Sequence, residues 1–319
     1  MTVLPVEPAH RLAARAAEQR WLVTSLWSEQ AVGIIGGEPK CCKSFLALDL
    51  AVSVAAGTAC LRRFPVPRSG RVLLYAAEDA LHIVRHRLDG ICAAAGLALA
   101  ELDLQVITAP TLRLDLEADR KALNTTIAKL APRLLVLDPF VRLHRIDENA
   151  SGEVAPLLAF LRELQRHHSL AVIVVHHAKK GAARMRAGQA LRGSSEFHAW
   201  GDSNLYLRRN GNLRDGSELT LTVEHRAAAS IPALTLELAQ RANAIALEVI
   251  ERPSAHIPLP SSVDERIIDA LGSLDHPLPF TDLRALVRVR TATLYQRLAA
   301  LTAQGHLLKS DHGYRLAAP

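Results

Sequence analysis

The sequence predicts an α/β protein whose mainly parallel sheet carries helices on both faces. Between residues 32 and 175, short apolar runs typical of buried parallel strands alternate with longer segments of helical periodicity. The first apolar run leads through a glycine-containing loop directly into a helical segment. Because strands joined by helices form right-handed βαβ units, the strands are expected to lie parallel, with a ligand-binding edge at their carboxyl ends.

The predicted elements follow one another in regular order. Strands are expected at 32–35, 71–76, 104–108, 133–137 and 170–175, and helices at 43–56, 81–95, 117–130 and 153–168. Shorter alternating runs follow at 205–207, 218–224, 234–238 and 244–250, with Asn210-Gly211 and Asp215-Gly216 between them. These dipeptides favour tight turns, so antiparallel hairpins are expected to extend the parallel sheet.

Composition divides the chain into four parts, namely an N-terminal segment (1–30), the α/β domain (31–251), a proline-rich linker (252–263) and a small C-terminal domain (264–319). The first part has a helical stretch over 8–20. It also holds Trp21 and Trp27, which either cover the core or form a lid over a bound ligand. In the last part, three short helical segments followed by a hairpin resemble a winged helix-turn-helix domain.

Composition also limits the class of protein. The chain has 319 residues, 49% of them apolar, and a net charge of +6, which is compatible with a polyanionic partner. Its four cysteines form no C-x-x-C pair, so neither a zinc site nor a disulfide framework is indicated. The N-terminus lacks the apolar region of a signal peptide, and no apolar run reaches the roughly 18 residues that span a bilayer. A cytoplasmic protein without membrane contact is expected.

The stretch from Gly37 to Ser44 has the spacing of a phosphate-binding loop, G-x-x-x-x-G-K-[ST], except that Cys42 replaces the second glycine. In such a loop, backbone N–H groups and the start of the following helix hold phosphate oxygens. Lys43 would reach the β and γ phosphates of ATP, and the Ser44 hydroxyl would bind Mg²⁺. The predicted nucleotide-binding residues are Gly37, Glu38, Pro39, Lys40, Cys41, Cys42, Lys43, Ser44 and Phe45. An ordinary strand-to-helix turn is the alternative.

Acidic residues end two of the other predicted strands. Asp138 follows strand 133–137, where a second Mg²⁺ ligand of such proteins lies, although an aspartate at a strand end also serves in turns. Glu78 follows strand 71–76 and is placed to orient or deprotonate a water that attacks the γ-phosphate. Its neighbour Asp79 is either an alternative base or only a cap for the next helix.

Two histidines and a basic segment follow strand 170–175. His176 or His177 would bind the γ-phosphate as a sensor, unless one is a core residue and the other lies at the surface. Five basic residues and no acid come next, namely Lys179, Lys180, Arg184, Arg186 and Arg192. This segment suits sequence-independent contacts with nucleic acid phosphates, or is a solvated loop. Three residues, Arg192, Arg208 and Arg209, are candidates for an arginine finger that reaches a neighbouring subunit's γ-phosphate.

The C-terminal part has side chains that a helix-turn-helix would present to DNA around the start of its last helix. They are Arg288, Arg290, Thr291, Thr293, Tyr295, Gln296 and Arg297. Seven basic and six acidic residues over 264–319 give a net charge of only +1. Contact with a protein partner is therefore the alternative to DNA.

In this order, the motifs resemble RecA-fold ATPases of the RepA type, the hexameric replicative helicases of plasmids. The resemblance covers about residues 30 to 210. It is carried by the loop at 36–44 and by Tyr75-Ala76-Ala77-Glu78-Asp79, Leu137-Asp138-Pro139-Phe140, Asp147-Glu148-Asn149-Ala150-Ser151-Gly152, His176-His177-Ala178-Lys179 and Arg192-Gly193-Ser194-Ser195. Where that family tends to carry its finger arginine, this chain reads Ala199-Trp200-Gly201-Asp202.

The resemblance implies a ring-forming ATPase that single-stranded DNA stimulates. In it, Lys43 and Ser44 bind phosphate and Mg²⁺, Asp138 binds the metal, Glu78 is catalytic, and the histidine pair is the sensor. A replicative helicase or related DNA motor of a plasmid or mobile element is therefore expected. The alternative is an ATP-switched DNA-binding regulator, recombination accessory or helicase loader with weak hydrolysis.

Overall fold

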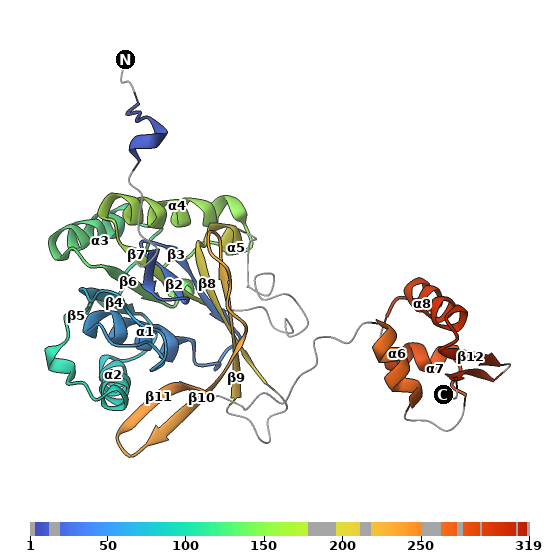
Figure 1. The fold of residues 1–319 in the computed structure, drawn as a ribbon. Helices are drawn as coiled ribbons and strands as arrows, with labels where there is room; N and C mark the ends of the chain where they lie inside the picture. The colour runs from blue at the N-terminus through green and yellow to red at the C-terminus, as the bar shows by residue number, and fades with distance from the viewer. Residues whose placement is uncertain are drawn as a thin grey trace. The chain divides into compact units, whose positions relative to one another are not determined.

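A computed structural model describes residues 4–12, 20–177, 196–210, 218–250, 263–272, 277–287, 289–310 and 312–317. The chain forms two compact units, Met1–Glu251 and Arg252–Pro319 (Figure 1). Within the ranges just given, no helix is long and apolar enough to cross a membrane.

The first unit is built on a nine-stranded sheet in the order β11-β10-β9-β8-β3-β7-β6-β4-β5. The parallel strands are β3 (Val32–Gly37), β4 (Val72–Ala76), β5 (Leu104–Val106), β6 (Leu134–Asp138), β7 (Ala171–His177) and β8 (Ser203–Arg209). The antiparallel strands are β9 (Glu218–His225), β10 (Leu234–Arg241) and β11 (Ala244–Val249). The predicted fold class is confirmed.

Strand β8 differs from the prediction. It was expected only in an antiparallel hairpin, but it pairs parallel with β3 on one side and antiparallel with β9 on the other. The reason is that β7 ends at the carboxyl edge, and the chain passes through α5 (Glu196–Trp200) before β8 begins at the opposite edge. Strand β8 therefore runs in the direction of β3 and carries its own carboxyl end to the same edge.

Helices cover both faces of the sheet (Figure 1). Helices α1 (Lys43–Ala56) and α2 (Leu81–Ala95) pack on one face, and α3 (Glu117–Leu130), α4 (Ser151–His168) and α5 pack on the other. In β7, Ile173 and Val175 belong to the first core cluster, while Val172 and Val174 belong to the second. Because both faces are buried, the strand is apolar at successive positions, which explains the continuous runs in the sequence.

The N-terminal tryptophans belong to a hairpin of β1 (Trp21–Val23) and β2 (Trp27–Ser28). Trp27 is fully buried, donates its indole N–H to the Ala31 carbonyl at 3.3 Å, and lies against Gly33 near the amino end of β3. The phosphate-binding loop is at the other end of that strand, so Trp27 covers the core and is no nucleotide lid. Of the stretch expected to be helical, 8–20, the described part contains a short 3₁₀ turn, η1 (Ala9–Arg11), and residues 13–19 lie outside the described ranges.

The second unit contains α6 (Val263–Gly272), α7 (Phe280–Val287) and α8 (Thr291–Ala303), followed by a hairpin of β12 (Leu307–Ser310) and β13 (Gly313–Leu316). Leu271, Leu283 and Leu298 contribute one buried residue from each helix to its core. Three short helices followed by a hairpin are what the sequence predicts for this part of the chain. Residues 251–262, which include nearly all of the expected linker, lie outside the described ranges.

Candidate active site at the carboxyl edge of the sheet

Parallel pairing brings most of the predicted site residues to one edge of the sheet. Gly37, at the end of β3, lies opposite His177 of β7 on one side and Leu207 of β8 on the other. Asp138, at the end of β6, pairs with Ala76 of β4. The phosphate-binding loop therefore shares this edge with the residues that follow β4, β6 and β7.

The loop has an unusual backbone at three positions. Gly37 has a φ of +157°, and a Cβ there would lie 2.3 Å from the Leu207 carbonyl oxygen, so no side chain fits. Lys40 and Cys42 are left-handed, with φ values of 63° and 61°. An L-residue in this conformation brings its Cβ too close to the backbone, at a cost of roughly 1–2 kcal/mol. Cys42 thus adopts a geometry that favours the glycine expected at its position.

Lys43 lies over the loop that precedes it. Its side chain is buried, and its ammonium donates to the Glu38 carbonyl at 2.7 Å and lies 3.9 Å from the Cys41 sulfur. Burial lowers the pKa of Lys43, against the opposing effects of Cys41 and Asp138. Burial also raises the pKa of the Cys41 and Cys42 thiols, so they stay protonated at neutral pH and add no negative charge beside the lysine.

Ser44 and Asp138 form the pair that fits a Mg²⁺ ion. Ser44 follows the phosphate-binding loop and acts on the Asp138 carboxyl, which is 8% exposed. Burial raises the pKa of Asp138 to about 6, while the Ser44 side chain opposes this rise. The described ranges hold no cluster of three or more His, Cys, Asp or Glu side chains that could bind a metal alone. Two protein oxygens suit Mg²⁺, which commonly takes its other ligands from substrate phosphates and water.

Glu78 follows β4 at the same edge. Its side chain is 41% exposed, and its Oε1 accepts a hydrogen bond from Arg142 Nε at 2.9 Å. Arg142 belongs to a 3₁₀ turn, η4 (Phe140–Arg142), that begins two residues after Asp138. Sequence reasoning missed Arg142. The signal that could have found it is its position four residues after Asp138, at the same edge of the sheet.

The neighbouring Asp79 has a different environment. Its carboxylate pairs with Arg87 of α2, whose guanidinium lies 5.4 Å from the centre of the Phe45 ring. The cap position of α2 is Ala80, with no side-chain hydrogen bond, so Asp79 does not cap that helix. Asp79 and Phe45 are therefore joined through Arg87, and each of the two neighbouring carboxylates, Glu78 and Asp79, is paired with an arginine.

The histidine pair is divided between two environments. His176 is 1% exposed and stacks on Phe197 of α5, with ring centres 4.3 Å apart. Its Nδ1 lies 4.0 Å from Glu148, which is also 3.4 Å from His144. His177 is half-buried beside Gly37. The structure thus places His177 beside the start of the phosphate-binding loop and His176 in a buried polar cluster with His144 and Glu148. Sequence reasoning missed this cluster because its members are separated along the chain.

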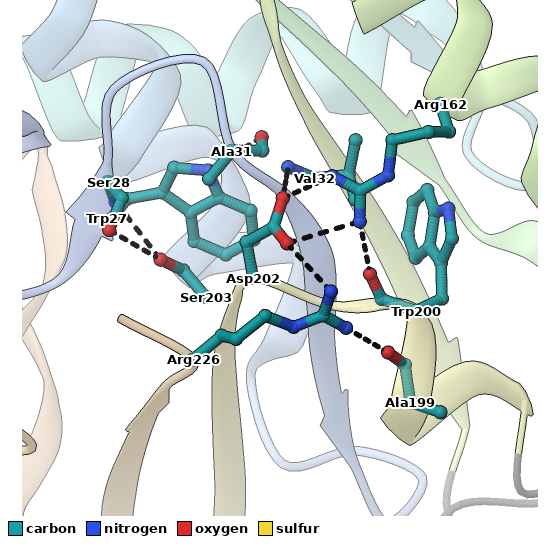
Figure 2. A network of polar contacts seen from close by, with 10 residues as sticks. All are labelled: Trp27, Ser28, Ala31, Val32, Arg162, Ala199, Trp200, Asp202, Ser203 and Arg226. Atoms are coloured by element: carbon teal, nitrogen blue, oxygen red, sulfur yellow. Dashed lines mark hydrogen bonds and ion pairs between the residues drawn. The ribbon is translucent and has the colours of Figure 1, made fainter. Parts of the chain in front are cut away.

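Residues 199–202 lie at the opposite end of the sheet from the phosphate loop. Figure 2 shows Asp202 between Arg162 of α4 and Arg226, and its carboxylate also accepts the N–H of Val32 at 3.3 Å. Arg162 donates in addition to the Trp200 carbonyl at 2.5 Å. These contacts tie α4 and the start of β8 to the first residue of β3.

One of the three finger candidates lies at the loop of its own chain. Arg209, the last residue of β8, donates to the Lys40 carbonyl at 2.5 Å. Arg208 is exposed on the same strand. The five predicted DNA contacts, Lys179, Lys180, Arg184, Arg186 and Arg192, lie outside the described ranges, as does Arg288.

A mostly parallel sheet with a phosphate-binding loop after β3 and an aspartate at the end of β6 defines a P-loop protein with a RecA-like fold. The family described as "AAA domain" matches residues 2–183, more than half of the chain, and the chain belongs to this family.

Two solved structures share the fold. One is described as an "ATPase Domain", with 12% identity, a TM-score of 0.53, and coverage of 69% of this chain and 86% of that one. The other is described as "Crystal structure of the RadB recombinase", with 17% identity, a TM-score of 0.50, and coverage of 70% and 92%.

Proposed function

We propose that this chain is a Mg²⁺-dependent ATPase that acts on DNA, as a replicative helicase or related motor of a plasmid or mobile element. The observation that carries the proposal is the shared carboxyl edge of the sheet, where Lys43 and Ser44 follow β3, Asp138 ends β6 and Glu78 follows β4. The AAA domain family supports ATP as the substrate. The structural neighbour named as an ATPase domain supports ATP hydrolysis, and the one named as a recombinase supports an action on DNA.

Each residue has a role that follows from its place. The loop N–H groups hold phosphate oxygens, and the Lys43 ammonium exchanges the Glu38 carbonyl for the β and γ phosphates. Glu78 orients the water for in-line attack on the γ-phosphate. Ser44 and Asp138 would hold Mg²⁺, which supplies charge stabilisation at the phosphates when bound. His177, beside Gly37, contacts the γ-phosphate and passes its presence to the segment that follows.

Two further parts of the chain would contact DNA or partner proteins, namely the basic segment 179–192 and the second unit. The basic segment 179–192 would bind the phosphates of single-stranded DNA, and the chain would assemble into a hexameric ring. The second unit, with its three helices and hairpin, would act as a winged helix that contacts DNA or a protein partner. Tyr295 is 59% exposed on α8 and is available for such a contact, whereas Arg297 is paired with Asp264.

A second candidate is an ATP-dependent switch with weak hydrolysis, such as a DNA-binding regulator, recombination accessory or helicase loader. It is favoured by the hydrogen bond between Arg142 and Glu78, which holds Oε1 of the carboxylate and leaves Oε2 to act on water. Weak turnover that DNA fails to stimulate, together with nucleotide-dependent assembly, would support the switch.

The test is ATP turnover of the full chain with and without single-stranded DNA, alongside its solution mass with and without nucleotide. Strong stimulation and unwinding of a forked duplex support the helicase, whereas stimulation without unwinding supports a motor of another kind. Lys43→Ala should abolish turnover, and Lys129→Ala, an exposed lysine on α3, is the matched control. Unchanged turnover in Lys43→Ala would remove the site assignment.

A further inference from the structure

We propose that Arg209 positions the phosphate-binding loop of its own subunit and is no finger for a neighbour's nucleotide. The proposal rests on the proposed function, because it assigns a role within the same nucleotide site. It is carried by the contact of Arg209 with the Lys40 carbonyl, and by the parallel strand that brings the two residues together.

Strand β8 contacts the loop at two positions. Its Leu207 carbonyl closes the space beside Gly37, where a Cβ would lie 2.3 Å from the oxygen. Arg209 is two residues further, and side chains two apart on a strand point to the same face. Leu207 belongs to the core cluster that contains α1, so Arg209 lies on the face where the loop leads into α1. The carboxyl end of β8 therefore packs against Gly37 at the start of the loop and donates a hydrogen bond to Lys40 in its middle.

The bonded carbonyl belongs to a left-handed residue. Lys40 has a φ of 63°, a conformation that an L-residue with a long side chain adopts at a cost. A charged donor to its carbonyl oxygen stabilises this turn, since charge-assisted hydrogen bonds are the stronger ones. Because the loop binds phosphate through its N–H groups, holding Lys40 in this conformation prepares the loop for phosphate before a nucleotide arrives.

The charge of Arg209 also reaches the residue before the catalytic lysine. It opposes the rise that burial causes in the pKa of the Cys42 thiol. The guanidinium thus contacts the loop at Lys40 and acts electrostatically on Cys42, the two left-handed residues of the loop. Arg208 precedes it and, by strand alternation, points to the opposite face.

A residue that positions the loop and a finger at the γ-phosphate affect nucleotide binding and hydrolysis differently. A loop that is poorly positioned loses affinity for ADP and ATP alike, because both carry the phosphates that the loop holds. A finger at the γ-phosphate instead acts on turnover, and its loss commonly costs about 10³ or more in kcat. The two roles therefore predict different changes in the same four quantities, namely kcat, KM and the two dissociation constants.

The experiment measures ADP and ATP binding and steady-state turnover of full-length Arg209→Ala, in the presence of Mg²⁺. We expect the Kd of both nucleotides to rise about five- to tenfold, with kcat at saturation within about threefold of the wild type. Arg209→Lys, which keeps the charge, should recover part of the affinity. The matched control is Arg241→Ala, an exposed arginine paired with Glu248, which should change neither constant. An unchanged ADP Kd together with a kcat lowered more than a hundredfold would overturn the proposal.

Mixing variants provides an independent test of action within one subunit. Arg209→Ala mixed with Lys43→Ala should give no more turnover than the sum of the two alone, because each subunit lacks a residue of its own site. A gain on mixing would show that Arg209 acts across an interface and would overturn the proposal. If the wild type hydrolyses no ATP, the proposed activity fails, but the ADP and ATP binding comparison still decides the role of Arg209.

Discussion

The Ser44 side chain opposes the rise that burial causes in the pKa of Asp138, although the two residues belong to elements separated in the sheet by β7. Ser44 lies in the first turn of α1, directly after the loop that follows β3, whereas Asp138 ends β6. Because Asp138 is buried, ionising it in the folded chain costs free energy. The stability of the protein should therefore depend on pH through this residue.

Asp138→Asn is expected to stabilise the free protein at high pH. The pKa of Asp138 is about 6 in the folded chain and 3.8 in an unperturbed aspartate, so the folded state binds this proton more tightly than the unfolded state. The carboxyl therefore makes stability fall as pH rises from about 4 to about 6, by ~3 kcal/mol at most. Asparagine cannot ionise, so the variant should melt above the wild type at pH 8 and close to it at pH 4.

Thermal unfolding at both pH values measures this difference. The control is Asp147→Asn, because hydrogen bonds from Asn149 lower the pKa of Asp147 and no gain at pH 8 is expected there. Equal differences between Asp138→Asn and wild type at pH 4 and pH 8 would contradict the buried, raised pKa. The same variant should lose ATP turnover, since it loses a charged ligand for Mg²⁺.

Cys42→Gly is expected to improve nucleotide binding or turnover. Glycine adopts the left-handed conformation of residue 42 without strain, although its greater freedom in the unfolded chain offsets part of the gain. The relief should strengthen ATP binding roughly two- to fivefold. Cys41→Gly is the matched comparison, because Cys41 is buried and does not have a left-handed backbone. Its replacement by glycine relieves no strain and should only weaken ATP binding. Equal effects of both substitutions on the ATP Kd would argue against strain at Cys42.

Glu78→Gln and Asp79→Asn should separate catalysis from structure. Glutamine cannot accept a proton from water, so kcat should fall on the order of 10²- to 10⁴-fold while the ATP Kd changes little. Asp79→Asn should keep most of the turnover and lose ~1 kcal/mol of stability, because it weakens the partly exposed pair with Arg87. Single-turnover kinetics and denaturant unfolding measure the two effects. A larger loss of turnover in Asp79→Asn than in Glu78→Gln would reverse the assignment of the base.

His176→Ala and His177→Ala should also differ in kind. Removing the buried ring of His176 leaves space beside Phe197, and the free energy of unfolding should fall by ~2 kcal/mol or more. His177→Ala should leave the melting temperature nearly unchanged and reduce the stimulation of ATP turnover by single-stranded DNA. If His177→Ala keeps full stimulation at unchanged stability, the sensor role at that position is wrong.

Sequence patterns were sufficient for the fold class and for most of the candidate site. Helices α1, α2 and α3 have the predicted bounds because their periodicity and end signals, such as Gly57, are local. Glu78 and Asp138 were predicted as site residues because they follow apolar strands, and parallel strands bring their carboxyl ends to one edge. The left-handed Cys42 agrees with the motif, which has glycine there.

Other features depend on which strands become neighbours. Strand β8 runs parallel to β3, and this pairing alone brings Arg209 to Lys40 and Leu207 to Gly37. Likewise, His176 and His177 are adjacent in sequence, and strand alternation separates them, but only the packing of α5 shows which one is buried.

The sequence by itself therefore determined the elements and the residues at their ends, because propensity, periodicity and end signals act over a few residues. The tertiary structure alone decided the partners of Arg209, Glu78 and His176. Such contacts depend on the order of strands in the sheet and on packing between segments far apart in the chain, and no local pattern encodes either.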